Sequence, residues 1–188
     1  MGILKKPTSL LNTTVCSDSI YAELINYSEE TIMANPLTLI MPVLPDTKLL
    51  TIVELLAKSQ PAIDAALESI GTVHFARFSL LDRSKPNLQP DLLEINKPSS
   101  TLMIGVITVY DGDFNPYISD FVAQLGDVFN ALLAVVVDGS TITPVQDNIA
   151  KFQDFVTTND ASQHKPNENL FSAYPQTVQQ ILAAFPPQ

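Results

Sequence analysis

The sequence predicts an α+β fold: a ferredoxin-like βαββαβ antiparallel sheet with appended helices. Two stretches, 72–82 and 101–110, carry β-branched and aromatic residues too continuously for strands with one face in water. Apolar residues at helical spacing lie before, between and after the predicted strands. The resulting order of elements matches the βαββαβ pattern.

Composition limits the classes of protein that this chain can represent. Its 188 residues, 46% of them hydrophobic, are enough for one domain with a real core. The net charge of −10, with scattered basic residues, argues against nucleic acid as a partner. A single cysteine, Cys16, excludes an internal disulfide and a metal site built from several cysteines.

No membrane segment is predicted, because no window approaches the roughly 20 uninterrupted apolar residues that a spanning helix needs. Polar residues interrupt the apolar run near the start of the chain, which argues against a signal peptide. Lys6 occupies the position where a myristoylation signal has Ser or Thr. We therefore expect a cytoplasmic protein.

The first part of the chain is predicted to be an arm and the rest a single domain. Residues 1–36 are expected to pack on the domain surface, with a short helix at 17–27, and residues 37–188 to form the ferredoxin-like domain. The first strand is predicted at 38–43. Pro42 has no N–H to donate, so it belongs at a sheet edge or a bulge.

The next segment is predicted to be a helix in two pieces. Asp46 is a candidate cap for its start, and Pro61 should interrupt it because proline removes a backbone donor and clashes one turn back. Gly71 should end the second piece.

Strand 72–82 is predicted to place His74 on one face and Arg77 on the other. Loop 83–100 contains three prolines, and its leucines suggest that it is pinned to something apolar. Strand 101–110 is also apolar on both faces, and Gly105 within it marks a bulge or a close approach by another group.

The last third is predicted to contain three helices and a strand. Asn115 and Pro116 suit the start of a long helix that ends before Asp138. Capping boxes at Thr143 and Thr177 predict two more helix starts, the second with Ile181 and Leu182 facing inward. A short strand is expected at 168–174.

A sheet that is apolar on both faces needs cover on both faces. Helices of a βαββαβ unit cover one face only, so something else must cover the other. A second subunit packed sheet to sheet would give a dimeric α+β barrel, which we favour. The N-terminal arm, the long loop or a small apolar ligand are the alternatives.

Three groups of residues occur in order: Val73-His-Phe-Ala-Arg-Phe78, Tyr110-Asp-Gly-Asp-Phe114 followed by Tyr117-Ile-Ser-Asp-Phe121, and Ala173-Tyr-Pro175 followed by Thr177-Val178. Over residues 37–184 they resemble a group of uncharacterised bacterial proteins that form dimeric α+β barrels and are distantly similar to dye-decolourising haem peroxidases. The resemblance implies haem as a candidate cofactor.

The chain departs from the peroxidase pattern, which has Gly-x-x-Asp-Gly, a distal Arg and a proximal His. Residues 108–112 read Thr-Val-Tyr-Asp-Gly and lack the leading glycine. His164 lies in a polar stretch instead of an apolar helix, and only one ferredoxin-like unit is present where those enzymes have two.

The candidate catalytic residues are His74, Arg77, Tyr110 and Asp111. His74 is either a hydrogen-bonded core or interface histidine, or a ligand or proton carrier. Arg77, if buried, must pair with a carboxylate such as Asp82, Asp111 or one from a partner subunit; otherwise it recognises an anionic substrate.

The candidate ligand-binding residues are Arg77, Tyr110, Asp113 and Tyr174. The two tyrosines either bring hydroxyls to a pocket mouth or pack at a rim. Asp111 and Asp113 match early positions of a calcium loop, but Pro116 and Val122 replace its glycine and its bidentate glutamate. A turn and helix cap explains them better, so no metal is predicted.

Two functions fit the sequence. The favoured one is a non-catalytic module that forms a homodimer through the sheet face. The alternative is a protein that binds or oxidises a small molecule, with a peroxidase-like haem protein as one version. The sequence does not decide whether the chain is an enzyme, nor does it name a ligand.

Overall fold

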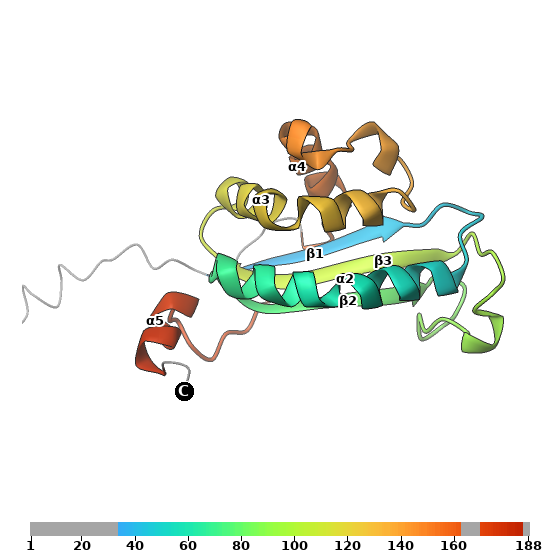
Figure 1. Cartoon of the computed structure of the whole chain (residues 1–188). Coiled ribbons are helices and arrows are strands. Elements are labelled where there is room, and N and C mark those ends of the chain that lie inside the picture. Colours follow the sequence, from blue (N-terminus) through green and yellow to red (C-terminus); the bar gives the residue numbers. More distant parts are fainter. Residues whose placement is uncertain (1–33, 163–169, 186–188) are drawn as a thin grey trace, which may run out of the picture. The chain divides into compact units, whose positions relative to one another are not determined.

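Three antiparallel strands form the sheet, in the order β1-β3-β2 (Figure 1). A computed structural model describes residues 34–162 and 170–185, all of which fall in one unit, Ile32–Gln188. The strands are β1 (Ala34–Pro42), β2 (Val73–Asp82) and β3 (Leu102–Asp111), and both outer strands run antiparallel to β3. The α+β class and the first three predicted strands are confirmed.

The core lies on one face of this sheet. On β3 the even-numbered residues Leu102, Ile104, Val106, Thr108 and Tyr110 are each at most 3% exposed. Helices α2 (Leu49–Ile70) and α3 (Phe114–Leu133) cover them, and both helices contribute buried side chains to the same cluster. This face matches the alternation predicted from the sequence.

Helix α2 is continuous, so the predicted interruption at Pro61 is wrong. Ile52, before the proline, and Ile63, after it, are both at most 1% exposed on the core side. Their burial outweighs the roughly 3 kcal/mol that an internal proline costs a helix. The predicted cap is also wrong: the helix begins after Lys48, not Asp46, while Gly71 ends it with φ 62° as expected.

Helix α3 begins two residues earlier than predicted, with Asp113 instead of Asn115 at its cap, and it ends at Leu133. The segment beyond it folds into a 3-10 turn, Gly139–Thr141, and a second, Val145–Asp147, before α4 (Ile149–Asn159).

The capping box predicted at Thr143 is wrong. The side chain of Gln146 does not reach back to Thr143; its Nε2 donates to Asp127 and its Oε1 accepts from Asn130, both on α3. Tertiary hydrogen bonds to α3 therefore replace the local cap.

The predicted fourth strand does not form in the residues that are described. Residues 168 and 169 lie outside them, and 170–174 form no strand. On the outer side of β1, isolated bridges join Leu39 to Asp160 and Val43, the residue after the strand, to Val136; Ala161 N also donates to Thr38 O. The described residues thus contain only part of the predicted βαββαβ layout.

Helix α5 (Val178–Ala184) begins with the capping box predicted at Thr177. The prediction that Ile181 and Leu182 face inward is wrong, because no residue of α5 is buried and Leu182 is 45% exposed. The helix is too short to reach the core.

The other face of the sheet is open among the described residues, and the expected cover by a second subunit, the N-terminal arm or a ligand stays a prediction. We call this side of the sheet the open face; it carries Phe75 and Arg77 of β2 and Ile107 of β3, with Arg77 and Ile107 directly opposite each other. Phe75 is 77% exposed and Ile107 is 40% exposed. At Gly105 a Cβ would lie 3.5 Å from Ile40 and Leu81, so side chains approach there; the bulge lies in β2.

None of the helices described is long and apolar enough to cross a membrane.

A methyl group at Gly139 should destabilise the fold. An added Cβ would lie 2.0 Å from the carbonyl oxygen of Leu133, and backbone cannot move aside cheaply. We expect Gly139→Ala to lower the free energy of unfolding by about 1–3 kcal/mol, measured by urea denaturation. Gly126→Ala is the comparison: its Cβ would meet the exposed Gln146 side chain, which can turn away at the cost of its hydrogen bonds to Asp127 and Asn130, while alanine favours the helix by about 1 kcal/mol, so the loss should be smaller. Equal losses in both variants would contradict the explanation.

Candidate functional site

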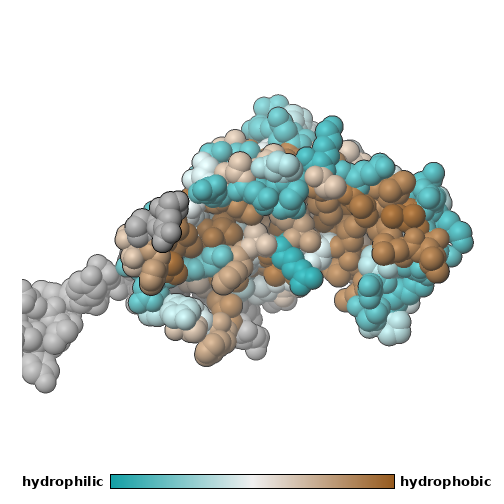
Figure 2. Space-filling model, turned by 60° about the horizontal axis from the view of Figure 1, so that its bottom comes forward, coloured by the Kyte–Doolittle hydropathy of each residue, from teal (hydrophilic) through white to brown (hydrophobic). Residues whose placement is uncertain are grey.

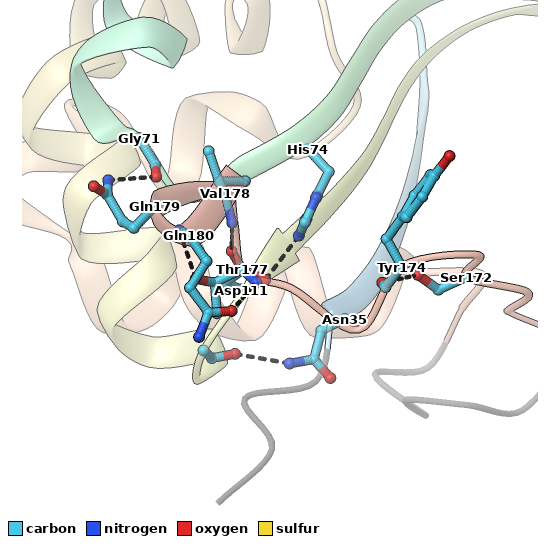
Figure 3. A network of polar contacts seen from close by, with 11 residues as sticks. Asn35, Gly71, His74, Asp111, Ser172, Tyr174, Thr177, Val178, Gln179 and Gln180 are labelled. Carbon is cyan, nitrogen blue, oxygen red and sulfur yellow. Dashed lines mark hydrogen bonds and ion pairs between the residues drawn. The ribbon is translucent and has the colours of Figure 1, made fainter. Parts of the chain in front are cut away.

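Asp111, the last residue of β3, joins three segments of the chain. Its side chain is 7% exposed; Oδ1 lies 2.8 Å from His74 Nε2, and Oδ2 accepts a 2.7 Å hydrogen bond from Val178 N (Figure 3). Its own N–H donates to Thr72 O. A buried carboxylate needs such partners, because leaving it without them would be costly.

His74 reaches Asp111 because of a register shift in β2. Val73 pairs with Tyr110 and Phe75 pairs with Val109, so His74 is an extra residue on its strand. Asp111 follows Ile107 and Val109 on the open face by alternation, and His74 turns towards it. The predicted separation of His74 and Arg77 onto opposite faces is therefore wrong, because a bulge breaks the alternation on which it depended.

A second contact holds the C-terminal helix beside the sheet. Gln179 Nε2 donates to Gly71 O at 2.8 Å. Gly71 has φ +62°, and a Cβ there would lie 2.6 Å from that same nitrogen. The absence of a Cβ at position 71 therefore permits both the left-handed backbone that ends α2 and the close approach of the Gln179 side chain.

An open groove of about 310 Å³ lies between the end of α2, the start of β2 and α5. Its lining is largely apolar: Leu67, Val73, Phe75, Ala76, Val178 and Leu182. The ionisable groups along it are His74 and the exposed Glu68. A neutral His74 that donates its Nε2–H to Asp111 would carry its lone pair on Nδ1.

Tyr110 lies in the core and does not join His74 and Asp111. Its ring stacks on Tyr117 with centroids 3.7 Å apart, and the Tyr117 hydroxyl hydrogen bonds to Thr108 Oγ1 at 2.7 Å. Burial, with smaller effects from Asp160 and Asp113, raises the pKa of Tyr110 to about 12. Burial also raises the pKa of Tyr117, and the hydrogen bond to Thr108 opposes this only in part.

The remaining candidates are dispersed over the surface. Arg77 is exposed and forms no ion pair with Asp82, Asp111 or any other residue in the described ranges. Asp82 instead accepts hydrogen bonds from Ser84 N and Oγ. Asp113 is an exposed cap residue without a side-chain cap bond, and Tyr174 is 72% exposed.

Asp82 is ionised at neutral pH. Burial by itself would raise its pKa, but hydrogen bonds from Thr101 and Ser84, with Lys85 nearby, lower it overall. The Asp82 carboxylate therefore stabilises the start of loop 83–100 and does not pair with Arg77.

The described residues form no cluster of metal-ligating side chains. Residues 34–162 and 170–185 contain no group of three or more His, Asp or Glu side chains that could hold a metal ion. The Nε2 of His74 is taken by Asp111, and Thr108 of the 108–112 motif is buried against Tyr117. His164 and Cys16 lie outside the described residues.

No protein-family model, curated protein or solved structure matches this chain. The resemblance noted from the motifs therefore stays a prediction.

Sequence reasoning missed how the candidate site is assembled. It selected His74 and Asp111 separately but not as a pair, and it did not connect Val178 or Gln179 to them. The capping box at Thr177 and the stop at Gly71 were visible, but nothing local shows that these two points meet.

Removing the charge of Asp111 should loosen the C-terminal helix. Asn at 111 keeps one acceptor oxygen but removes the charge, so Val178 N donates to a neutral acceptor and His74 Nε2 must change tautomer to accept from the amide N–H. We expect Asp111→Asn to speed amide hydrogen exchange in residues 177–184 by about tenfold, since a hydrogen bond to a charged group contributes about 1.5–3 kcal/mol. Asp113→Asn, with an exposed carboxylate, is the control. Unchanged exchange in Asp111→Asn would show that Asp111 does not hold α5.

Alkaline pH should destabilise the core through Tyr110. Its pKa is about 12 when folded and 10.0 for the unperturbed side chain, so the folded state holds the proton more tightly. Stability from this group is complete below pH 10 and is lost between about pH 10 and about pH 12.

Between about pH 10 and about pH 12, the free energy of unfolding should fall by about 1–3 kcal/mol less in Tyr110→Phe than in the parent protein. Urea denaturation at both ends of the interval measures this. Tyr174→Phe, at an exposed position, should behave like the parent. An identical alkaline loss in the parent and in Tyr110→Phe would contradict the assignment.

Proposed function

We propose that this protein is a non-catalytic module that self-associates through its open face. The observation that carries the proposal is the exposure of Ile107, 40%, at the middle of the central strand. Its opposite neighbour on β2 is Arg77, and Phe75 lies two residues along that strand with 77% exposure. Figure 2, which brings this side forward, shows apolar side chains over much of it.

Self-association through the face is favoured over pairing at a sheet edge. The outer edge of β1 is occupied by bridges from Leu39 to Asp160 and from Val43 to Val136. The edge of β2 carries a bulge, which discourages edge pairing. Arg77 lies on the open face beside Ile107, so face-to-face packing must leave its guanidinium at the rim or give it a carboxylate partner from the second copy.

A dimeric α+β barrel is the arrangement that we propose for the pair. Two sheets pack face to face about 10 Å apart when each has one uncovered apolar face. The order β1-β3-β2, with α2 and α3 on one face, supports a ferredoxin-like unit as the building block. The second copy would then cover Phe75 and Ile107.

Small-molecule binding is the second candidate function. It is favoured by the groove beside α5, in which the imidazole of His74 is oriented by the Asp111 carboxylate. A histidine held in this way can exchange a proton with a bound ligand at Nδ1. Ligand-detected NMR of small amphipathic acids and amines, with His74→Phe as the control, tests this; binding unaffected by the substitution would exclude the groove.

A charge on the open face should abolish self-association. Ile107→Lys would place an ammonium group at the centre of the proposed contact, directly opposite Arg77, where burial of two like charges is costly. We expect a shift from dimer to monomer, with at least about a hundredfold weaker association, measured by sedimentation. The control is Ile149→Lys, at the partly exposed first residue of α4. A parent protein that is monomeric at high concentration would overturn the proposal.

A further inference from the structure

Exposed apolar side chains gather in two segments that flank the open face. The loop arm, residues 83–100, exposes Leu88 (42%), Leu92 (68%) and Leu93 (94%). The C-terminal arm, residues 170–185, exposes Phe171 (89%), Tyr174 (72%), Leu182 (45%) and Phe185 (77%). Solvent exposure of so many large apolar groups is typical of an interaction surface.

The two arms lie at opposite ends of β2. The C-terminal arm is held at Gly71 and Asp111, beside the first residues of β2, and the loop arm follows its last residue, Asp82. Figure 1 shows α5 and the loop on the side of the sheet away from α3, the side of the open face. The open face therefore runs between the two arms.

The loop arm is held in place although its leucines face solvent. Its backbone is tied down by hydrogen bonds from Asp82 N to Leu88 O, from Leu50 N to Ile95 O and from Ser99 N to Thr47 O. Leu92 and Leu93 lie in a 3-10 turn whose start is capped by Asp91. Because its backbone is held and Leu92 and Leu93 are exposed, this turn is a preformed apolar surface for a partner.

The recesses beside the two arms differ in character. The groove beside the C-terminal arm is lined mainly by apolar side chains. The recess beside the loop arm, about 250 Å³, is lined by charged groups that include Asp82, Lys85, Asp91, Glu94 and Lys97. A leucine in the second recess would displace water from these charged groups, which is costly, whereas the apolar lining of the first suits a leucine.

Charge distinguishes the arms in the same way. Residues 170–185 contain no charged side chain, whereas Asp91 and Glu94 flank the two leucines of the loop arm and form ion pairs with Lys85 and Lys97. A two-fold contact of loop arm on loop arm would take these ion pairs out of water, which costs more than their attraction returns. Contact of a loop arm with a C-terminal arm avoids this.

We propose that, in the dimer, the loop arm of each copy packs on the C-terminal arm of the other, with Leu92 and Leu93 at the groove beside α5. This inference rests on the proposed function. It requires a two-fold axis that lies between the sheets and crosses the strands, because only that axis brings opposite ends of β2 together.

The available area is sufficient for such a dimer. Phe75, Phe171, Tyr174 and Phe185 are each more than 70% exposed. At about 150–250 Å² for each aromatic side chain, they present roughly 600 Å², against about 800 Å² per partner in a standard interface. The leucines of the loop arm and Ile107 supply more.

Disulfide trapping between copies tests the arrangement. In full-length protein with Cys16→Ser, one preparation carries Leu93→Cys and a second carries Leu182→Cys; both positions are exposed. The two are mixed, allowed to exchange subunits and oxidised mildly. We expect mixed disulfide dimers at least about tenfold above a Lys151→Cys and Leu182→Cys mixture, because neighbouring thiols in a complex experience millimolar effective concentration.

The outcomes separate this inference from the proposed function. A parent protein that sediments as a monomer overturns both. A dimer that Ile107→Lys dissociates, but that yields only Leu93→Cys self-linked product or no cross-link, overturns the arm-to-arm contact and leaves the proposed function standing. In protein that retains Cys16, an internal disulfide between Cys16 and a cysteine at 182 would show that the chain's own N-terminal residues occupy the groove, which also overturns it.

Discussion

The structure depends on the burial of one face of a narrow sheet. Three strands about 4.8 Å apart are narrower than two helices about 10 Å in diameter lying side by side, so α2 and α3 together cover that face completely. Every even-numbered residue of β3 is sealed beneath them. The hydroxyl group of Thr108 forms a hydrogen bond with the Tyr117 hydroxyl, so this buried oxygen of the central strand has a partner.

Because α2 and α3 fill the covered face, the elements that follow pack elsewhere. Helix α4 packs on α3, where Phe152 lies with its ring 5.1 Å from that of Phe129, and its end bridges to β1 at Asp160. Helix α5 has no buried residue and is held by hydrogen bonds from Val178 and Gln179. The described residues thus leave the open face of the sheet without a covering layer.

The Asp111 carboxylate connects this arrangement to the proposed function. It orients His74 at the start of β2 and fixes the start of α5 next to the groove. The C-terminal arm owes its place to these polar contacts, whereas the loop arm owes its place to backbone hydrogen bonds and to Ile95, which packs against the core. Both arms are thereby set at the ends of the open face with their apolar side chains outward.

Local patterns in the chain predict each element whose identity depends on neighbours within a few residues. Alternation predicted β2 and β3, helical spacing predicted the buried faces of α2 and α3, and a capping box predicted the start of α5. Patterns failed where a distant contact competed: Pro61 stays inside a helix because burial on both sides holds it, and Gln146 bonds to α3 instead of capping locally.

The sequence alone therefore determines the α+β class and the residues that line the core, because those follow from periodicity and apolarity along the chain. Only the tertiary structure decided that His74, Asp111 and Val178 meet, and that His74 and Arg77 do not lie on opposite faces. The reason is physical: a one-residue bulge reverses the faces of a strand, and contacts between residues 67 positions apart leave no local signal.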